Sequence, residues 1–228
     1  MLSASASGIW RWQPRGWAPV VAGVSDRSGS LEGIRASLPA PCLVMQAEQV
    51  HGASIVGLER AVPGDDQVPG CDGLVTRRPG LMLAIRTADC LPIFAWDAVQ
   101  RVVGLAHVGW QGLVKELPIR FISFFRQMYH SAPHNLKIAI GPAIHACCYE
   151  VGPEFVPLFG DCITQRGHRR TCDLIAAARR QLARAGVPSS QVIDSGHCTA
   201  CEPRWYSVRR EGTGTGRLCS FILLKPSV

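Results

Sequence analysis

The sequence predicts an α+β fold in which mixed β-sheets are sandwiched by helices. Three apolar, β-rich runs follow one another closely over 81–85, 91–96 and 102–106, as strands of a buried sheet do. Two amphipathic segments, over 113–129 and 174–184, repeat apolar residues at helical spacing. These strands and helices do not follow a regular βαβ rhythm, which favours α+β or a mixed-sheet sandwich.

Residues 1–40 contain many prolines, glycines and serines, so we expect them to be irregular apart from a strand over 20–24. Further strands are predicted over 43–45 and 54–56. The three central apolar runs are expected to be neighbouring strands of one sheet, because they are close together and only residues 97–100 separate the last two.

One continuous helix is predicted over 113–129, with Pro118 inside its first turns. Asp173 is a good N-cap for a second helix, whose alanine-rich body ends before Gly186. The remaining predicted elements are a strand over 136–140, a short helix over 153–159, and short strands over 191–194 and 221–224.

The chain of 228 residues is expected to form a single domain over 1–228, because no linker or long charge run divides it. An apolar fraction of 47% argues against a disordered protein. The net charge of +7 suits an anionic partner. Nucleic acid is not favoured, since the basic residues are not interleaved with aromatic ones, and a phosphate-bearing small substrate fits the charge as well.

The ten cysteines could indicate a secreted disulfide scaffold, but residues 1–17 make a poor signal peptide, because tryptophans and arginines break them. No charge-free apolar run approaches the roughly 20 residues of a membrane span. We therefore expect a cytoplasmic protein, without membrane contact, whose cysteines are reduced thiols. Such thiols either pack as small apolar groups or serve as ligands.

His51, Cys90 and His107 each lie beside a glycine, a turn or the end of an apolar run. Two imidazoles and a thiolate are good zinc ligands, and a site with three protein ligands keeps an open position where water can be activated. Their separations of 39 and 17 residues match no short ligand pattern, so core histidines and a buried cysteine remain an alternative. A nucleophilic Cys90 activated by His107 is another. Copper is less favoured, because no methionine is near these residues.

The other cysteines give weaker indications of a metal site. Cys198 and Cys201 form a CxxC pair without a second pair at zinc-ribbon spacing, so we expect no zinc knuckle there. A disulfide between the adjacent Cys147 and Cys148 would be strained, and both are expected to pack as small side chains. His197 is expected to be exposed, with a supporting role beside a metal as the alternative.

Four further residues are candidates for substrate chemistry. Arg209 and Arg210, beside a glycine-rich loop, could grip a phosphate by bidentate hydrogen bonds, and Arg27 could do the same from its turn. Ordinary surface arginines are the alternative interpretation. Asp89 is the candidate general acid or base, unless it caps a turn or orients a histidine.

Several motifs, in order and at comparable spacing, resemble one family, known as the laccase-domain, polyphenol oxidase-like or peptidoglycan editing factor family. The resemblance extends from about Gly23 to the end of the chain. It rests on residues 49–52, 71–76, 87–92, 106–110, 140–151, 173–182 and 207–217.

The resemblance implies a zinc enzyme that cleaves adenosine, inosine and methylthioadenosine with phosphate and also deaminates adenosine. The family's zinc ligands carry over onto His51, Cys90 and His107. The implied fold is a mixed-sheet sandwich related to cysteine hydrolase-like toxins. Two other interpretations stay open: an editing hydrolase that removes serine from a peptidoglycan precursor with Cys90 as nucleophile, and a non-catalytic, metal-stabilised binding protein.

The chain also departs from the family pattern. The family usually has His-Ala-Gly-Trp-Arg-Gly where this chain has Val108 and Gln111, so one positive charge is missing near the site. Its usual Gly-Pro-Cys-Ile-Gly-Pro is replaced over 141–146, and the segment between Gly29 and Pro41 is shorter. We therefore expect an intact metal site with altered pocket walls.

Overall fold

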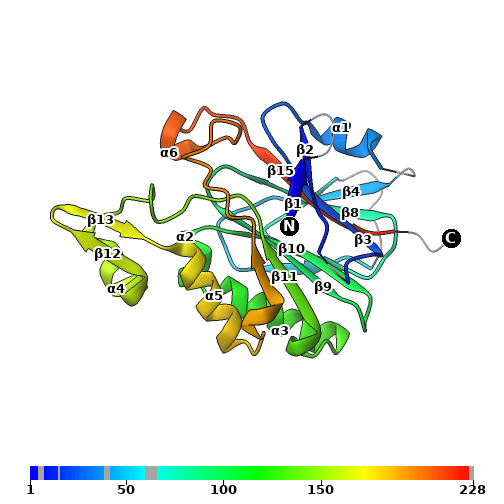
Figure 1. The fold of residues 1–228 in the computed structure, drawn as a ribbon. Coiled ribbons are helices and arrows are strands. Elements are labelled where there is room, and N and C mark those ends of the chain that lie inside the picture. The colour runs from blue at the N-terminus through cyan, green and yellow to red at the C-terminus, as the bar shows by residue number, and fades with distance from the viewer. Residues whose placement is uncertain (5–7, 15, 39–41, 60–65, 226–228) are drawn as a thin grey trace.

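The computed structural model describes residues 1–4, 8–14, 16–38, 42–59 and 66–225 (Figure 1). Its strands are β1 (Leu2–Ala4), β2 (Ile9–Trp12), β3 (Val20–Ser25), β4 (Leu43–Ala47), β5 (Ile55–Gly57), β6 (Gln67–Val68), β7 (Gly73–Thr76), β8 (Leu81–Thr87), β9 (Leu91–Asp97), β10 (Val102–Val108), β11 (Leu136–Ile140), β12 (Ile163–Arg166), β13 (Arg169–Cys172), β14 (Val192–Asp194) and β15 (Leu218–Leu224). Its α-helices are α1 (Leu31–Ala36), α2 (Trp110–Val114), α3 (Leu117–Tyr129), α4 (Val156–Phe159), α5 (Leu174–Arg184) and α6 (Val208–Glu211). Short 3-10 helices are η1 (Pro133–Asn135), η2 (Pro153–Phe155), η3 (Gly160–Cys162) and η4 (Ser189–Gln191).

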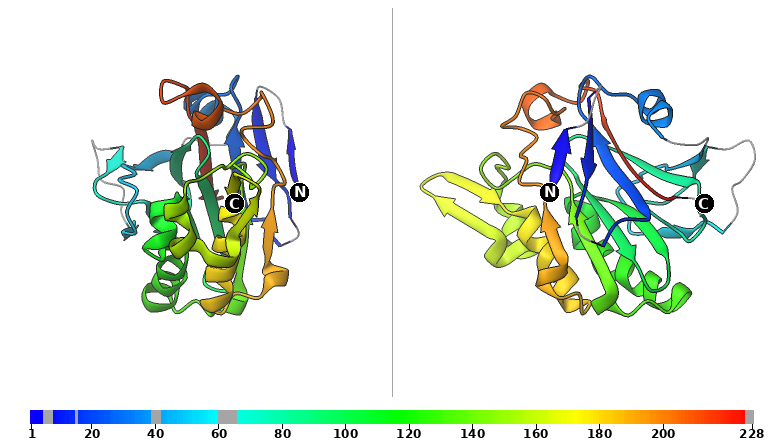
Figure 2. Two further views of the ribbon diagram at one scale, coloured as in Figure 1. Left: turned by 90° about the vertical axis from the view of Figure 1, so that its left-hand side faces the viewer. Right: turned by 45° about the vertical axis from the view of Figure 1, so that its right-hand side comes forward.

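Most of these strands belong to two mixed sheets. The first has seven strands in the order β1-β2-β3-β15-β8-β4-β6, and the second has six in the order β14-β11-β9-β10-β7-β5. Helices α2, α3 and α5 lie together on one side of the molecule and α1 lies on the opposite side (Figures 1 and 2). The predicted α+β class, with mixed sheets between helices, is confirmed.

The central strands are buried on both faces. Alternate side chains along each of these strands contribute to two different parts of the core. Along β8, Leu81, Leu83 and Ile85 contribute to the core between the two sheets, whereas Met82 and Ala84 face the core under α1. Strand β10 alternates in the same way between the inter-sheet core and the core under the helices. Because neighbouring side chains of a strand point to opposite faces, the continuous apolar runs follow from this double burial.

Two helices replace the one predicted over 113–129. Helix α2 ends at Val114, and α3 begins at Leu117 after Glu116 adopts a left-handed backbone with φ of 58°. Pro118 then occupies the first turn of α3, where its missing N–H leaves no intrahelical hydrogen bond unmade. The helical spacing of apolar residues continues through both helices because each buries its apolar face against the same sheet.

Two further predictions were wrong. The described part of residues 1–38 is not irregular, because it contains β1 and β2 at the edge of the first sheet and α1, whose N-cap Ser30 accepts a hydrogen bond from Gly33 N. The three central apolar runs do not share one sheet, because β8 belongs to the first sheet and β9 and β10 to the second. Among the helices that the structure describes, none is long and apolar enough to cross a bilayer.

The division of β8 and β9 between the sheets positions the candidate site. Only Ala88, Asp89 and Cys90 connect these strands, so the chain crosses from one sheet to the other in a tight turn where Asp89 has φ of 91°. The antiparallel register pairs His107 of β10 with Pro92 of β9. Cys90 therefore lies at the same sheet end as His107.

Candidate metal and substrate site

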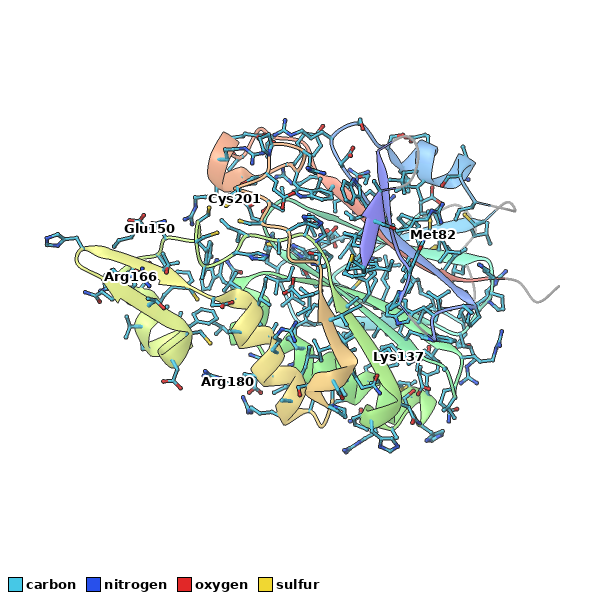
Figure 3. All side chains as sticks on the ribbon, in the orientation of Figure 1. Met82, Lys137, Glu150, Arg166, Arg180 and Cys201 are labelled. Carbon is cyan, nitrogen blue, oxygen red and sulfur yellow. The ribbon has the colours of Figure 1, made fainter. Side chains whose placement is uncertain are left out.

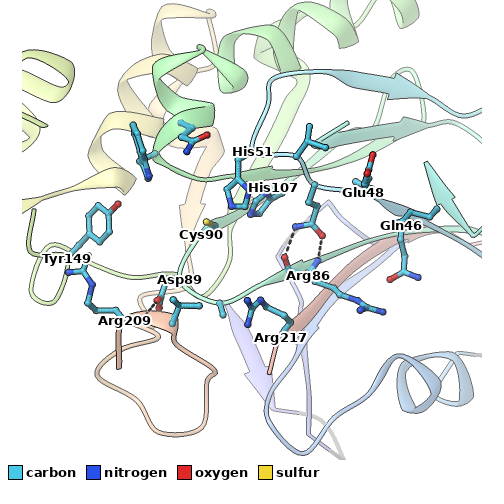
Figure 4. A pocket seen from close by; sticks show the side chains of 18 residues that line it. Gln46, Glu48, His51, Arg86, Asp89, Cys90, His107, Tyr149, Arg209 and Arg217 are labelled. Carbon is cyan, nitrogen blue, oxygen red and sulfur yellow. Dashed lines mark hydrogen bonds between the residues drawn. The ribbon is translucent and has the colours of Figure 1, made fainter. Parts of the chain in front are cut away.

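Three side chains that are distant in sequence meet at one end of the two sheets. His51 comes from the loop after β4, Cys90 from the β8–β9 turn and His107 from the end of β10. Their ligand atoms all lie within 4.8 Å of one another (Figure 4). The two imidazole rings are 4.9 Å apart at an interplanar angle of 82°. The structure thus brings together the three residues that the sequence singled out as ligands.

The loops that carry this group are held in uncommon backbone conformations. His51 and Gln49 both have positive φ, of 54° and 66°. Such a backbone costs energy for a residue other than glycine and persists only where the surroundings impose it. Here the Gln49 side chain exchanges two hydrogen bonds with the Arg86 backbone of β8, at 2.6 and 2.7 Å. Gly109 provides room, because a Cβ there would lie 3.1 Å from Cys90 Sγ.

A buried carboxylate, Asp72, positions both histidines. Its Oδ1 accepts hydrogen bonds from His107 Nδ1 at 2.8 Å and from the backbone N of His51 at 3.1 Å. Its Oδ2 accepts from Gly52 N at 2.6 Å. With Nδ1 of His107 occupied, Nε2 is the ring nitrogen left to ligate a metal, which is the usual carboxylate–histidine–metal arrangement.

The sequence singled out Asp89, and not Asp72, as the acidic residue of the site. Asp72 was visible only as a member of the motif over 71–76. A polar side chain at the start of an apolar strand was the one local signal for it. The structure shows it to be fully buried, where an unpaired carboxylate would be costly.

Hydrogen bonding within the group shifts its ionisation. Burial opposes the protonated form of His107, but hydrogen bonds with Asp72 and Cys90 raise its pKa to about 9. Burial likewise opposes the Cys90 thiolate, yet hydrogen bonds with His107 and His51 lower the pKa of Cys90 to about 7. The pKa of Asp72 is lowered because its hydrogen bonds from His107 and Gly52 outweigh burial. The metal-free site therefore favours an ion pair of the Cys90 thiolate, the form that binds metals, with protonated His107, which has to lose a proton when a metal binds.

We expect Cys90 of chelator-treated protein to react with iodoacetamide with a midpoint near pH 7, because only the thiolate attacks. His107→Asn removes the strongest of the interactions that favour the thiolate, so its midpoint should move upward by about one pH unit or more. Peptide mass spectrometry over a pH series measures this for Cys90 alone. Cys219, whose pKa burial raises to about 12, is the internal control and should stay unmodified. An unchanged midpoint in the variant would contradict the assigned hydrogen bond.

The group lies in a pocket of about 920 Å³ (Figure 4). Arg86, Arg209 and Arg217 bring positive charge to its lining, and Trp110 and Tyr149 bring aromatic faces. The other lining residues are Gln46, Ala47, Glu48, Gln49, Val50, His51, Gln67, Ala88, Asp89, Cys90, His107, Gln111 and Val208. The pocket therefore combines possible metal ligands, cations and aromatic rings, which suits an anionic or partly aromatic small molecule.

The predicted phosphate-binding arginines do not all lie at this pocket. Arg209 does, but Arg27 and Arg210 are not among its lining residues. Arg27 pairs with Glu211 and lies over the ring of Tyr206. Arg210 also contacts Glu211 and donates to backbone carbonyls of the loop before α6. Both guanidinium groups thus hold the C-terminal loops, and Arg86 and Arg217 are the pocket cations that the sequence did not single out.

Asp89 faces the pocket from the β8–β9 turn. Its Oδ1 accepts a hydrogen bond from Thr199 Oγ1 at 2.6 Å, and its Oδ2 accepts from the backbone N of Arg209 at 2.7 Å. Thr199 itself is fully buried. Asp89 therefore connects the turn that carries Cys90 to the start of α6. The orientation of a histidine, one of the roles considered for Asp89, belongs to Asp72.

The family departures noted in the sequence fall in different places. Val108 is fully buried in the core under the helices and forms no pocket wall. Gln111 lines the pocket, so the missing arginine is a real change at the site. Within 141–146, Ala143 and Ile144 are buried, and Ile144 N donates to Asp89 O at 2.9 Å.

A family model described as multi-copper polyphenol oxidoreductase laccase matches residues 29–225. The chain is 37% identical to purine nucleoside phosphorylase YlmD of Geobacillus stearothermophilus, over 77% of this chain and 70% of the relative. It is 31% identical to adenosine deaminase RL5, from an unknown prokaryotic organism, over 80% of this chain and 75% of that protein. Identity to purine nucleoside phosphorylase YfiH of Escherichia coli is 32%, over 78% and 72% of the two chains.

Solved structures agree with these matches. The crystal structure of YlmD from Geobacillus stearothermophilus superposes with a TM-score of 0.91 at 30% identity, covering 99% of both chains. A Bacillus licheniformis protein, YfiH, superposes with a TM-score of 0.89 at 26% identity, over 98% of this chain and 99% of the other.

Proposed function

Because the chain belongs to the family described as multi-copper polyphenol oxidoreductase laccase, as the resemblance of its motifs implied, we propose that it is a zinc-dependent purine nucleoside phosphorylase that also deaminates adenosine. Its substrates would be adenosine, inosine and methylthioadenosine with phosphate. Relatives named purine nucleoside phosphorylase and adenosine deaminase support this family-level function in nucleoside processing. The observation that carries the proposal is the meeting of His51, Cys90 and His107 inside a pocket with cations and aromatic rings.

The chemistry of these donors fits zinc. One thiolate and two imidazoles are a common ligand set for a catalytic zinc that keeps an open position, and Asp72 supports it as a hydrogen-bonded carboxylate behind His107. Copper fits less well, because none of the described residues that line the pocket is a methionine that could serve as the weak axial ligand of a blue-copper site. Zinc held by the three residues would supply Lewis-acid chemistry at the inner end of the pocket.

Other residues of the pocket would bind the phosphate and the purine. We assign phosphate binding to Arg86, Arg209 and Arg217, since guanidinium groups match phosphate oxygens bidentately. The faces of Trp110 and Tyr149 would hold the purine by stacking. Arg209 already lies over the Tyr149 ring at 4.9 Å, so the phosphate and purine contacts would be coupled.

The contacts of Asp89 support a positioning role at the pocket. Both of its carboxylate oxygens accept hydrogen bonds, from Thr199 and from the backbone of Arg209. We propose that Asp89 fixes Arg209 at the pocket. A second lone pair on each oxygen still allows it to accept a proton from substrate, which is the general-base role that the sequence suggested.

An editing hydrolase with Cys90 as nucleophile is the second candidate, and one observation favours it. The pKa of Cys90 is lowered to about 7 by hydrogen bonds with His107 and His51, even though burial opposes this, and a Cys–His pair of this kind can act as a nucleophile and base. The test is release of serine from the peptidoglycan precursor. Turnover of neither substrate would leave the non-catalytic binding protein as the remaining interpretation.

The zinc-loaded protein is expected to release hypoxanthine from inosine only when phosphate is present, and to convert adenosine to inosine without phosphate. Arg86→Ala should raise the KM for phosphate roughly tenfold, because a charge-assisted hydrogen bond contributes about 1.5–3 kcal/mol. Its deamination rate should stay unchanged, since that reaction uses no phosphate. Arg126→Ala, on the exposed face of α3, is the matched control. Coupled assays of both products measure these effects, and absence of both activities in zinc-loaded protein would refute the proposal.

A further inference from the structure

A second group of thiols lies outside the residues that the proposed reaction uses. Its members, here called the cysteine tetrad, are Cys147, Cys148, Cys198 and Cys201. The first two follow β11, and the other two belong to the loop after β14 (Cys201 is labelled in Figure 3). All four sulfur atoms lie within 4.8 Å of one another.

The sequence predicted no zinc knuckle here, because the CxxC pair of Cys198 and Cys201 had no partner pair at the usual spacing. The structure supplies the partner pair from the adjacent cysteines, 51 positions before the CxxC pair. Backbone hydrogen bonds bring the two segments together: Ala143 N donates to His197 O at 3.2 Å, and Thr199 N donates to Ala143 O at 2.9 Å. The adjacent cysteines therefore contact the CxxC pair, and Cys147 is exposed.

The sulfur spacing matches one tetrahedral ion. Zinc–sulfur bonds of about 2.3 Å in a tetrahedron place the sulfurs about 3.8 Å apart. The Sγ–Sγ distances are 3.3 Å for Cys148–Cys201, 3.5 Å for Cys147–Cys201, and 3.7 Å for both Cys147–Cys148 and Cys147–Cys198. All four thiols are free, and a disulfide would need about 2.05 Å. An iron–sulfur cluster would spread its cysteines over several irons and so separate them further.

The surrounding backbone is arranged for a thiolate. The backbone N–H of His145 donates to Cys198 Sγ at 3.4 Å. Together with the backbone N–H groups of Cys201 and Ala200, it lowers the pKa of Cys198 although burial opposes the charge. Burial, and then the hydrogen bond with Cys201, raise the pKa of Cys147 and of Cys148. A divalent cation at the centre of the four thiols would stabilise their ionised form.

We propose that the cysteine tetrad holds a structural zinc ion in a closed site with four thiolate ligands, separate from the candidate active site. A site in which the protein supplies all four ligands leaves no open position, so this zinc would contribute to folding and not to turnover.

The tetrad is connected to the pocket through its two segments. Tyr149, which lines the pocket, directly follows Cys148, and Thr199, which donates to Asp89, directly follows Cys198. Arg209 Nη1 donates to the carbonyls of Cys148 and Glu150 at 3.3 and 2.8 Å. The proposed zinc would therefore hold together the loop that carries Tyr149 at the pocket and the loop whose Thr199 supports Asp89.

Metal analysis of five proteins tests the proposal. Wild type should carry about two zinc ions per chain, Cys90→Ala and Cys201→Ser about one each, and the double variant none. Cys162→Ser, which alters a buried cysteine elsewhere in the core, should keep both. X-ray absorption of the single zinc in Cys90→Ala should show four sulfur ligands at about 2.3 Å.

The Cys90→Ala spectrum keeps the test decisive even if Cys201→Ser folds poorly. A Cys90→Ala protein that contains no zinc, or iron in its place, or a disulfide within the tetrad, overturns the proposal. So does a Cys201→Ser protein with the zinc content of wild type. Failure of the proposed enzyme activity leaves the zinc of Cys90→Ala unaffected, so the two proposals fail separately.

Discussion

Asp72→Ala should lower the affinity of the candidate active site for zinc by about 10- to 100-fold, as loss of a hydrogen-bonded carboxylate behind a metal-binding histidine does. The substitution leaves three donors without their acceptor: His107 Nδ1 and the backbone N–H groups of His51 and Gly52. It should also lower the free energy of unfolding by about 1–3 kcal/mol, since these groups lie in a buried environment. Competition with a chelator of known affinity measures the first effect, and urea denaturation measures the second.

The matched control for this prediction is Asp97→Ala. Asp97 is also fully buried and accepts two backbone hydrogen bonds, from Val99 and Gln100, but it lies at the end of β9 that is away from Cys90. Its loss should lower stability without changing zinc affinity. Equal zinc affinity in the Asp72 variant and wild type would show that Asp72 only stabilises the fold.

Cys90→Ala should abolish both nucleoside activities, with a fall of at least about a hundredfold, because metal electrostatics contribute several kcal/mol to a transition state. It should also remove one zinc per chain. The result alone does not separate a ligand from a nucleophile, so chelator-treated wild type is the necessary comparison. It keeps the Cys90 thiol and lacks only the metal.

If Cys90 is a ligand, chelated wild type and Cys90→Ala are equally inactive, and added zinc restores only wild type. If Cys90 is a nucleophile, chelated wild type remains active and releases serine from the peptidoglycan precursor. Stopped assays with and without added zinc distinguish these outcomes, and activity that survives chelation would exclude the metal-dependent mechanism.

The local patterns in the sequence predicted much of the secondary structure. The runs over 81–85, 91–96 and 102–106 became β8, β9 and β10, and Asp173 caps α5 by accepting a hydrogen bond from Ala176 N at 2.8 Å. These signals succeed because strand alternation and helix caps depend on residues close in sequence. The family assignment succeeded for the same reason, since its motifs are short and contiguous. The single-domain organisation over 1–228 stays a prediction.

Partners distant in sequence were harder to predict. The assignment of β8 to a different sheet from β9 depends on which strands it pairs with, β15 and β4, and neither is adjacent in sequence. The same holds for Arg27 and Arg210, whose roles are set by Glu211 and by the carbonyls of the C-terminal loops. Local composition carries no information about such pairings.

The fold class, the family and the three residues that could hold a metal were predictable from the amino-acid sequence, because each depends on short motifs. The folded structure was needed to show that Asp72, and not Asp89, supports a histidine, and that the adjacent cysteines lie beside the CxxC pair of Cys198 and Cys201. Both findings have the same cause. Hydrogen bonds and metal coordination require distances of a few ångströms. Residues that are distant in the sequence reach such distances only when the two sheets and their connecting loops have folded.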